Sequence, residues 1–314
     1  MSNLRNLGNE FSVPIRPDED GYIGRECPVE ECLGYFKITL GTGIKGPAPC
    51  RCPYCGHSGD SNTFFTREQI EYAQSVVLRK VGEALTKDLK ALEFEHKPRG
   101  MLGIGISLKL KESPPLPIRY YREKQLETEV ICDNCTLRYA IYGVFGWCPD
   151  CGVHNSLQIL GKNLELAKKE LGLAGSSDKE MADHLVGDAL ENAVSAFDGF
   201  GRELCLRQGA DISFQNLPVA RRRVEEKLGV DFASVLGTDD WQSICRAFLK
   251  RHLLAHKLRV VDEEYMQRAN DPTAVIGRKV PLNEEDVRFT IRAVEALGKH
   301  LFEKLFQGKL RGEL

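Results

Sequence analysis

Closely spaced cysteine pairs are the residues of this sequence with the clearest chemistry. Cys132 and Cys135 form a Cys-x2-Cys pair, and twelve residues separate it from a second such pair, Cys148 and Cys151. Two pairs of this spacing, joined by a short hairpin, place four thiolates tetrahedrally around Zn²⁺, at about 2.3 Å from each sulfur. We therefore predict a zinc site with these four ligands.

Another cysteine cluster lies near the N-terminus and leaves more than one choice of ligands. The four thiolates that we favour are those of Cys27, Cys32, Cys52 and Cys55. Cys50 or His57 could replace one of them, because both lie close to the favoured set in the sequence. A glycine follows the last cysteine of each cluster, at Gly56 and Gly152, where the backbone turns and its amides can donate to sulfur.

Both zinc sites are expected to be structural. A catalytic zinc keeps an open coordination position, whereas four thiolates complete the coordination sphere. Small modules that cannot build a sufficient core use a metal in its place. The two clusters resemble zinc ribbons, and this resemblance implies binding of nucleic acid or of a protein partner.

A cationic stretch in the C-terminal part is the second candidate for chemistry. Between Arg246 and Lys257, two arginines and two histidines share a predicted helix with apolar residues. An acid or base that titrates near neutral pH, together with a fixed cation, is the minimum for cleaving RNA without a metal, with the 2′-hydroxyl as nucleophile. Arg251 and His256 supply both groups. Because they are about 140° apart on a regular helix, they converge only if the arginine reaches back or, more naturally, if two subunits share the site.

The same stretch resembles the signature of HEPN domains. Arg251-His252-x3-His256 matches the Arg-x4–6-His pattern of that family, in which Asn, Asp or His often follows the arginine. A long preceding helix and a final helix after residues 277–282 extend the resemblance over about residues 181 to 308. It implies a bundle of four to five helices, commonly dimeric, with metal-independent endoribonuclease activity and frequent roles in antiviral defence and toxin systems.

Carried onto this chain, the resemblance assigns roles to three residues. Arg251 would hold the scissile phosphate, His256 would transfer a proton or orient the 2′-hydroxyl, and His252 would support the pair. Arg246 with His252 also fits the spacing and is the second choice.

A non-enzymatic interpretation competes with this one. His252 and His256 share a helical face, and Arg251 could simply be solvated beside a leucine core. The protein would then be a zinc-binding, dimerising protein that interacts with nucleic acid or protein. Glu191 and Asp198, on the preceding helix, are left unassigned because carboxylates on an amphipathic helix usually form its polar face.

Composition and net charge indicate the class of protein and limit how it could bind nucleic acid. With 42% hydrophobic and 28% charged residues the chain has the ordinary mixture of a folded soluble protein. The net charge of −2 gives no overall attraction to nucleic acid, so RNA binding would rely on local basic surface such as residues 221–223 and 250–259. No apolar run approaches the roughly 20 residues that cross a bilayer, and no signal peptide is visible, so we expect a cytoplasmic protein without membrane contact.

The periodicity of apolar residues places these candidates on secondary structure. Helical spacing begins after Thr66, a plausible N-cap, and continues to about residue 94. Alternation over residues 104–110 predicts a strand before the Pro-rich turn at 113–117. Apolar stripes in residues 185–200 and 287–305 predict long helices. His154, just past the second cluster, is expected at the surface.

These patterns predict a multidomain α+β protein, with two small zinc ribbons, an intervening helix and strand, and an all-α HEPN-like bundle. The predicted parts are a zinc-ribbon-like module 1–65, a connector 66–125, a second zinc-ribbon-like module 126–160, a polar linker 161–180 and a HEPN-like helical domain 181–314. The expected partners are RNA, a second copy bound through the helical domain, and a protein bound through the ribbons.

Overall fold

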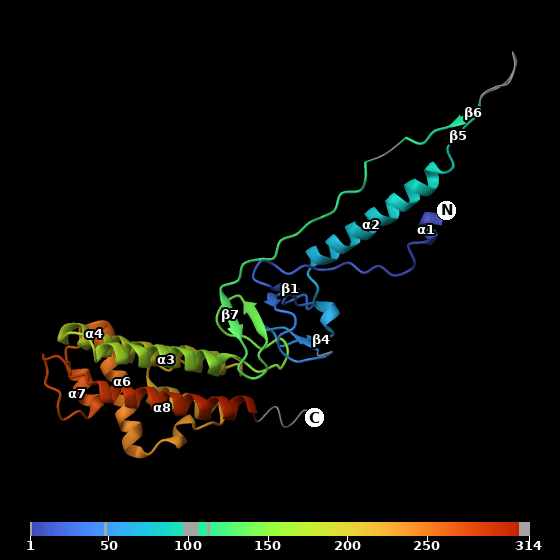
Figure 1. Cartoon of the computed structure of the whole chain (residues 1–314). Helices are drawn as coiled ribbons and strands as arrows, with labels where there is room; N and C mark the ends of the chain where they lie inside the picture. Colours follow the sequence, from blue (N-terminus) through green and yellow to red (C-terminus); the bar gives the residue numbers. More distant parts are fainter. Residues whose placement is uncertain (1, 47–48, 97–105, 112–113, 308–314) are drawn as a thin grey trace, which may run out of the picture. The chain divides into compact units, whose positions relative to one another are not determined.

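The chain forms two compact units, Met1–Val153 and His154–Leu314. The computed structural model describes residues 2–46, 49–96, 106–111 and 114–307 (Figure 1). Mixed α and β structure with two groups of four cysteines makes up the first unit, and helices make up the second. The predicted mixture of α and β structure is confirmed. Within the described ranges, no helix has the length and apolarity needed to cross a membrane.

One antiparallel sheet in the first unit joins the two cysteine clusters. Strands β1 (Ile23–Glu26) and β2 (Tyr35–Ile38) belong to the first cluster, and β7 (Thr128–Ile131) and β8 (Arg138–Ile141) belong to the second. Their order is β1-β2-β8-β7, so the strands of the two clusters meet at β2 and β8. The prediction of two separate modules, 1–65 and 126–160, is therefore corrected, because each hairpin completes the sheet of the other.

A single hydrophobic core lies beneath this sheet. It contains cysteines of both clusters together with aromatic and aliphatic side chains from both hairpins. Its buried members are Cys27, Phe36, Ile38, Cys50, Cys52, Phe64, Val130, Cys132, Leu137, Tyr139, Ile141 and Cys148. A change at one cluster therefore reaches the packing around the other.

The connector between the clusters contains the helix and the strand that the sequence predicts. After β3 (Cys50–Arg51), β4 (Ser58–Gly59) and the short η1 (Ser61–Phe64), helix α2 spans Arg67–Lys90. Thr66 is confirmed as its N-cap and forms a reciprocal capping box with Gln69. The helix ends at Lys90, a few residues before the predicted end near residue 94, because Phe94 begins β5 (Phe94–His96). β5 pairs with β6 (Ile106–Leu108), which confirms the predicted strand; residues 104, 105 and 113 of the predicted strand and turn lie outside the described residues.

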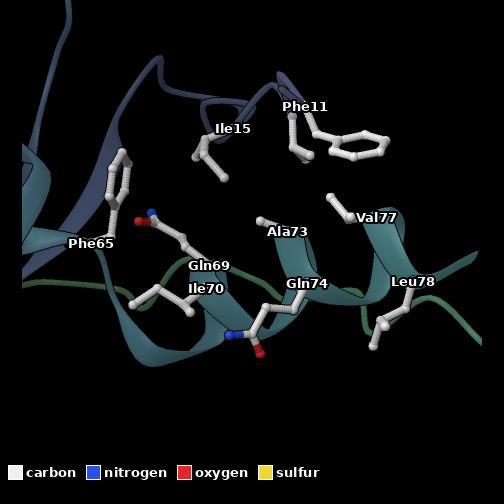
Figure 2. A pocket seen from close by; sticks show the side chains of 10 residues that line it. Phe11, Ile15, Phe65, Gln69, Ile70, Ala73, Gln74, Val77 and Leu78 are labelled. Atoms are coloured by element: carbon white, nitrogen blue, oxygen red, sulfur yellow. The ribbon is translucent and has the colours of Figure 1, made fainter. Parts of the chain in front are cut away.

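An apolar groove of about 590 Å³ runs between α2 and the extended N-terminal segment (Figure 2). Phe11 and Ile15 line it from that segment, and Ala73 and Val77 line the helical side. Val13 also lines the groove. Near the other end of the helix, Asp88 accepts hydrogen bonds from backbone amides of α1 (Ser2–Arg5). The N-terminal segment is thus attached to α2 by a polar contact at one end and by apolar side chains along its length.

The second unit is built from helices that bury the apolar stripes seen in the sequence. Its helices are α3 (Ser156–Ala174), α4 (Lys179–Leu206), α5 (Leu217–Leu228), α6 (Thr238–Lys257), α7 (Glu263–Ala269) and α8 (Glu284–Phe302), with short turns η2 (Phe232–Val235) and η3 (Glu303–Gln307). Buried members of the two stripes are Ala189, Leu190, Ala193, Val194, Phe197 and Phe200 on α4, and Val287, Ile291, Val294, Leu297 and Leu301 on α8. The two long helices are confirmed.

Two expectations for this part of the chain are wrong. The predicted linker 161–180 is mostly helix α3, which packs along α4 and buries Leu160, Leu164 and Leu171. This spacing of apolar residues is itself helical and outweighs the polar residues between them. His154, expected at the surface, is only 2% exposed; its ring stacks on Phe306 at a centroid distance of 5.6 Å.

A buried carboxylate, Asp198 on α4, fixes the loop that follows the helix. Its Oδ1 accepts hydrogen bonds from the backbone N–H of Phe214 at 2.6 Å and from the hydroxyl of Ser213 at 3.1 Å. Its Oδ2 accepts one from the side-chain amide of Gln215 at 3.3 Å. The carboxylate therefore has a structural role.

We expect the Asp198→Ala variant to lower the free energy of unfolding of the helical unit by about 2–4 kcal/mol, because the buried Phe214 N–H loses its acceptor. The measurement is urea-induced unfolding followed by circular dichroism. Asp188→Ala removes a half-exposed carboxylate from the same helix and should leave the midpoint within error. Equal midpoints for the two variants would contradict this role.

Candidate functional site

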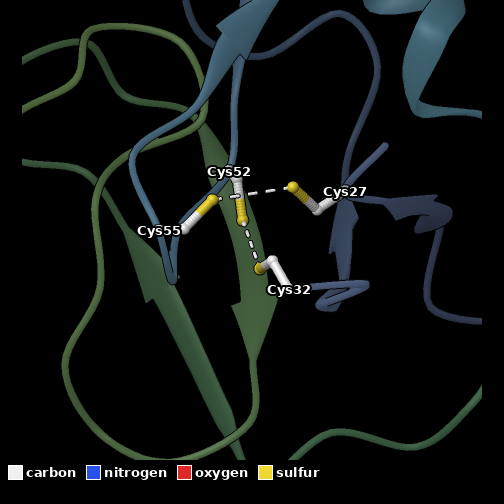
Figure 3. Close-up of side chains that lie close together, drawn as sticks. All are labelled: Cys27, Cys32, Cys52 and Cys55. Carbon is white, nitrogen blue, oxygen red and sulfur yellow. Dashed lines mark hydrogen bonds between the residues drawn. The ribbon is translucent and has the colours of Figure 1, made fainter. Parts of the chain in front are cut away.

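The four cysteines favoured for the first cluster lie together in the structure. The sulfurs of Cys27 and Cys55 are 3.6 Å apart, and those of Cys32 and Cys52 are 3.7 Å apart (Figure 3). All four sulfurs lie within 4.8 Å of one another. Cys50 and His57, the alternative ligands, are not members of this group.

Cys50 instead occupies the shared core as a buried thiol. Burial raises the pKa of this thiol to about 12, so it stays protonated at neutral pH. Cys50 lies on β3, just before the ligand pair Cys52 and Cys55, and is a member of the hydrophobic core but not of the four-sulfur group. The structure thus separates the spare cysteine from the four that converge.

The second cluster has the same geometry. The sulfurs of Cys132 and Cys151 are 3.6 Å apart, and those of Cys135 and Cys148 are 3.5 Å apart. A tetrahedral ion with metal–sulfur bonds of about 2.3 Å requires sulfurs about 3.8 Å apart, whereas a disulfide requires about 2.05 Å. The spacing in both clusters fits four thiolates around one metal ion.

Each cysteine pair closes a turn of the same form. The residue after the second cysteine of every pair has a positive φ, and these residues are Leu33 (44°), Gly56 (77°), Thr136 (65°) and Gly152 (68°). In the turn that begins at Cys132, its N–H donates to the carbonyl of Leu137 at 2.9 Å, and the N–H of Thr136 donates back to the Cys132 carbonyl at 2.8 Å. Turns with the same two hydrogen bonds begin at Cys52 and Cys148.

These turns direct backbone amides at the sulfurs. In the turn that starts at Cys52, for example, the N–H of Tyr54 donates to the Cys52 sulfur at 3.4 Å. Such hydrogen bonds stabilise thiolates and orient them for a metal. The glycines at two of the four positions were visible in the sequence, but Leu33 and Thr136 gave no signal of a left-handed backbone.

Hydrogen bonds also join the two clusters directly. The N–H of Arg51 donates to the carbonyl of Pro149 at 2.8 Å, and the N–H of Trp147 donates to the carbonyl of Pro53 at 2.9 Å. A Cβ added at Gly152 would lie 2.8 Å from the Arg51 guanidinium, so this glycine leaves room for the arginine. The two sites are therefore linked by backbone hydrogen bonds, and each contains four cysteines that can bind a metal ion.

Helix α6 carries the candidate catalytic residues on two of its faces. His252 and His256 are exposed, and their ring centroids lie 4.8 Å apart. Burial, followed by the charge of His256, lowers the pKa of His252, so its imidazole is neutral at neutral pH. The structure brings the two histidines together at the surface.

Arg251 lies against α4 rather than beside His256. Its side chain is 14% exposed, its Nη2 donates to the Ser195 hydroxyl at 3.3 Å, and it lies 3.8 Å from a carboxylate oxygen of Glu191. Within the described residues, no hydrogen bond or ion pair joins Arg251 to His256. Glu191, which has no role predicted from the sequence, is one helical turn from Ser195, and this spacing places both on one face of α4.

The other arginines considered for this site have structural partners. Arg246, the second choice, donates to the carbonyls of Ala269 at 3.1 Å and Asn270 at 3.0 Å, at the end of α7. In the basic run 221–223, Arg221 forms an ion pair with Asp231 at 2.5 Å. Arg246 and Arg221 therefore each have a partner within the helical unit.

Comparison with known proteins identifies no relative of this chain. No family model matches the chain, and no curated protein and no solved structure matches it.

Proposed function

We propose that the protein is a metal-independent endoribonuclease of the HEPN type whose cysteine clusters hold two structural Zn²⁺ ions. The proposal rests on one observation above all: His252 and His256 are exposed side by side on α6, adjacent in sequence to the nearly buried Arg251. Exposed imidazole side chains are available for proton transfer to and from a substrate.

Arg251 would serve as the fixed cation of this site. Its contacts with Ser195 and Glu191 hold the guanidinium in place, and a pre-positioned cation stabilises charge as it develops on a phosphate without reorganisation. His256 would accept the proton of the 2′-hydroxyl as its oxygen attacks the phosphorus, with His252 supporting it. The bond from phosphorus to the 5′-oxygen breaks as the bond to the 2′-oxygen forms, the 5′-oxygen takes a proton from water, and His256 releases its proton to solvent. The products are a 2′,3′-cyclic phosphate and a 5′-hydroxyl.

The active form would be a dimer through the helical unit. Arg251 and His256 lie on different faces of α6, so a second copy is required to bring the arginine of one chain to the histidine of the other. Zinc in the cysteine clusters would support the fold of the first unit, which would bind the RNA or a protein partner.

The proposal is tested by incubating the purified protein in EDTA with labelled RNAs and with the same sequences that carry a 2′-deoxy nucleotide at each site of cleavage. We expect RNA to be cut and the 2′-deoxy linkages to resist, because the nucleophile is then missing. Products are assigned by their 2′,3′-cyclic phosphate ends. Cleavage of the 2′-deoxy substrates would exclude this mechanism, and intact RNA throughout would favour the non-enzymatic interaction protein.

A further inference from the structure

The histidine pair on α6 has the spacing of a chelate. His252 and His256 are four residues apart, so their side chains point from the same face of one regular helix, Thr238–Lys257. We propose that these two imidazoles bind a borderline divalent cation, such as Ni²⁺ or Zn²⁺, at a site separate from the two cysteine clusters.

The geometry of the rings fits a shared ion. Imidazole nitrogens bind such a cation at about 2.0–2.1 Å, which places two nitrogens about 3.3 Å apart in a tetrahedral arrangement. Ring centroids 4.8 Å apart, with an angle of 57° between the planes, leave the edges of both rings able to reach that separation. Two histidines in this relation on one helix are a known arrangement for zinc ligands.

The charged groups around the pair are mixed in sign, and each has a partner of its own. Glu264 on α7 is exposed and pairs with Arg268 at 2.7 Å. The two basic neighbours of the pair have acidic partners, since Lys257 contacts Asp262 and Arg251 contacts Glu191. The ligands that this surface offers to a cation are therefore the two imidazoles.

Neutral imidazoles are the form that binds metal. The remaining coordination positions face solvent and would hold water, as expected for a cation bound to an exposed pair. The site would use imidazole nitrogens, whereas the cysteine clusters use only sulfur, so the two kinds of site prefer different metals.

One consequence concerns the proposed ribonuclease, and it rests on that proposed function. A metal ion at the pair would occupy the lone pairs that proton transfer requires. Binding would therefore inhibit RNA cleavage, and EDTA would relieve the inhibition.

The test is calorimetric titration of Ni²⁺ into the zinc-loaded full-length protein, without RNA. We expect about one Ni²⁺ per chain to bind, and each of His252→Ala and His256→Ala to weaken binding by at least about tenfold, because a chelate becomes a single ligand. His184→Ala is the matched control: this exposed histidine lies on α4 beside Asp188 and should leave the affinity unchanged. A zinc-sensitive dye in parallel reports any displacement of zinc from the cysteines.

Several outcomes overturn the proposal. Absence of Ni²⁺ binding by the wild-type protein would do so, as would equal affinities for the wild-type protein and the two α6 variants, or uptake matched by release of zinc. The result is independent of catalysis: a protein that binds Ni²⁺ but cuts no RNA refutes only the ribonuclease, and one that cuts RNA without binding Ni²⁺ refutes only the metal site.

Discussion

With zinc in both cysteine clusters, as proposed, replacing Cys148 with serine is expected to lower the zinc content of the purified protein from two ions per chain to below one. Cys148 is a fully buried member of the second cluster, and its sulfur lies 3.5 Å from that of Cys135. Loss of one thiolate removes the fourth ligand of this site. The larger expectation is that the first cluster also loses metal, although its four cysteines are intact.

The physical reason is the bonded structure that the clusters share. β2 pairs with β8, the Arg51 N–H donates to Pro149, and cysteines of both clusters lie in one core. A structural zinc contributes about 10–16 kcal/mol in small zinc-binding peptides, which matches or exceeds the roughly 5–15 kcal/mol by which whole domains are stable. Without this contribution the sheet unfolds and the remaining site loses its geometry.

Zinc content is measured by elemental analysis after gel filtration, and the fold by circular dichroism. Cys50→Ser is the control, because it alters a buried cysteine of the same core that is outside the four-sulfur group. This variant should retain two zinc ions. If Cys148→Ser retained one full equivalent and an intact first cluster, the two modules would be independent, as the sequence alone suggested.

The cysteine ligands could be predicted from the sequence, whereas the sheet that joins the two clusters could not. Close spacing of cysteines is a local property. Three Cys-x2-Cys pairs, 52/55, 132/135 and 148/151, and the wider pair Cys27 and Cys32 were therefore identified from the sequence as the cysteines that converge, with Cys50 outside the group. The pairing of Lys37 with Ala140 joins strands about a hundred residues apart. No local pattern predicts such a pairing. Alternating apolar residues indicate that a segment forms a strand, but they do not identify the strand with which it pairs.

The helical unit shows the same division. Periodicity identified α4 and α8, whose stripes are long and regular, but the polar residues of 161–180 concealed α3. The position of Arg251 and His256 on different faces followed from helical geometry alone. The partners of Arg251 on α4 depend on how two helices pack, and packing sets which neighbouring face meets the arginine.

We expect His256→Ala and Arg251→Ala each to lower the rate of RNA cleavage by about 10²–10⁴-fold, the usual loss when a proton-transfer group or a donor that stabilises the transition state is removed. The rate is measured under single-turnover conditions in EDTA. His184→Ala, which alters an exposed histidine on α4, should retain the wild-type rate. Circular dichroism checks that each variant is folded.

Mixing the two inactive variants tests the shared site more sharply than either variant alone. In a dimer that pairs Arg251 of one chain with His256 of the other, a mixed dimer of the two variants keeps one intact site of two. Because random exchange at equal concentrations makes half of the dimers mixed, about a quarter of the wild-type activity should return. If no activity returned after exchange, both groups would have to act within one chain. That result would contradict the proposed dimer, in which Arg251 is held against Ser195 and Glu191 on α4 and does not reach His256 of its own chain. In the proposed dimer, the Arg251 held against α4 in one chain and the exposed His256 of the other act together across the interface, and the mixing experiment measures this directly.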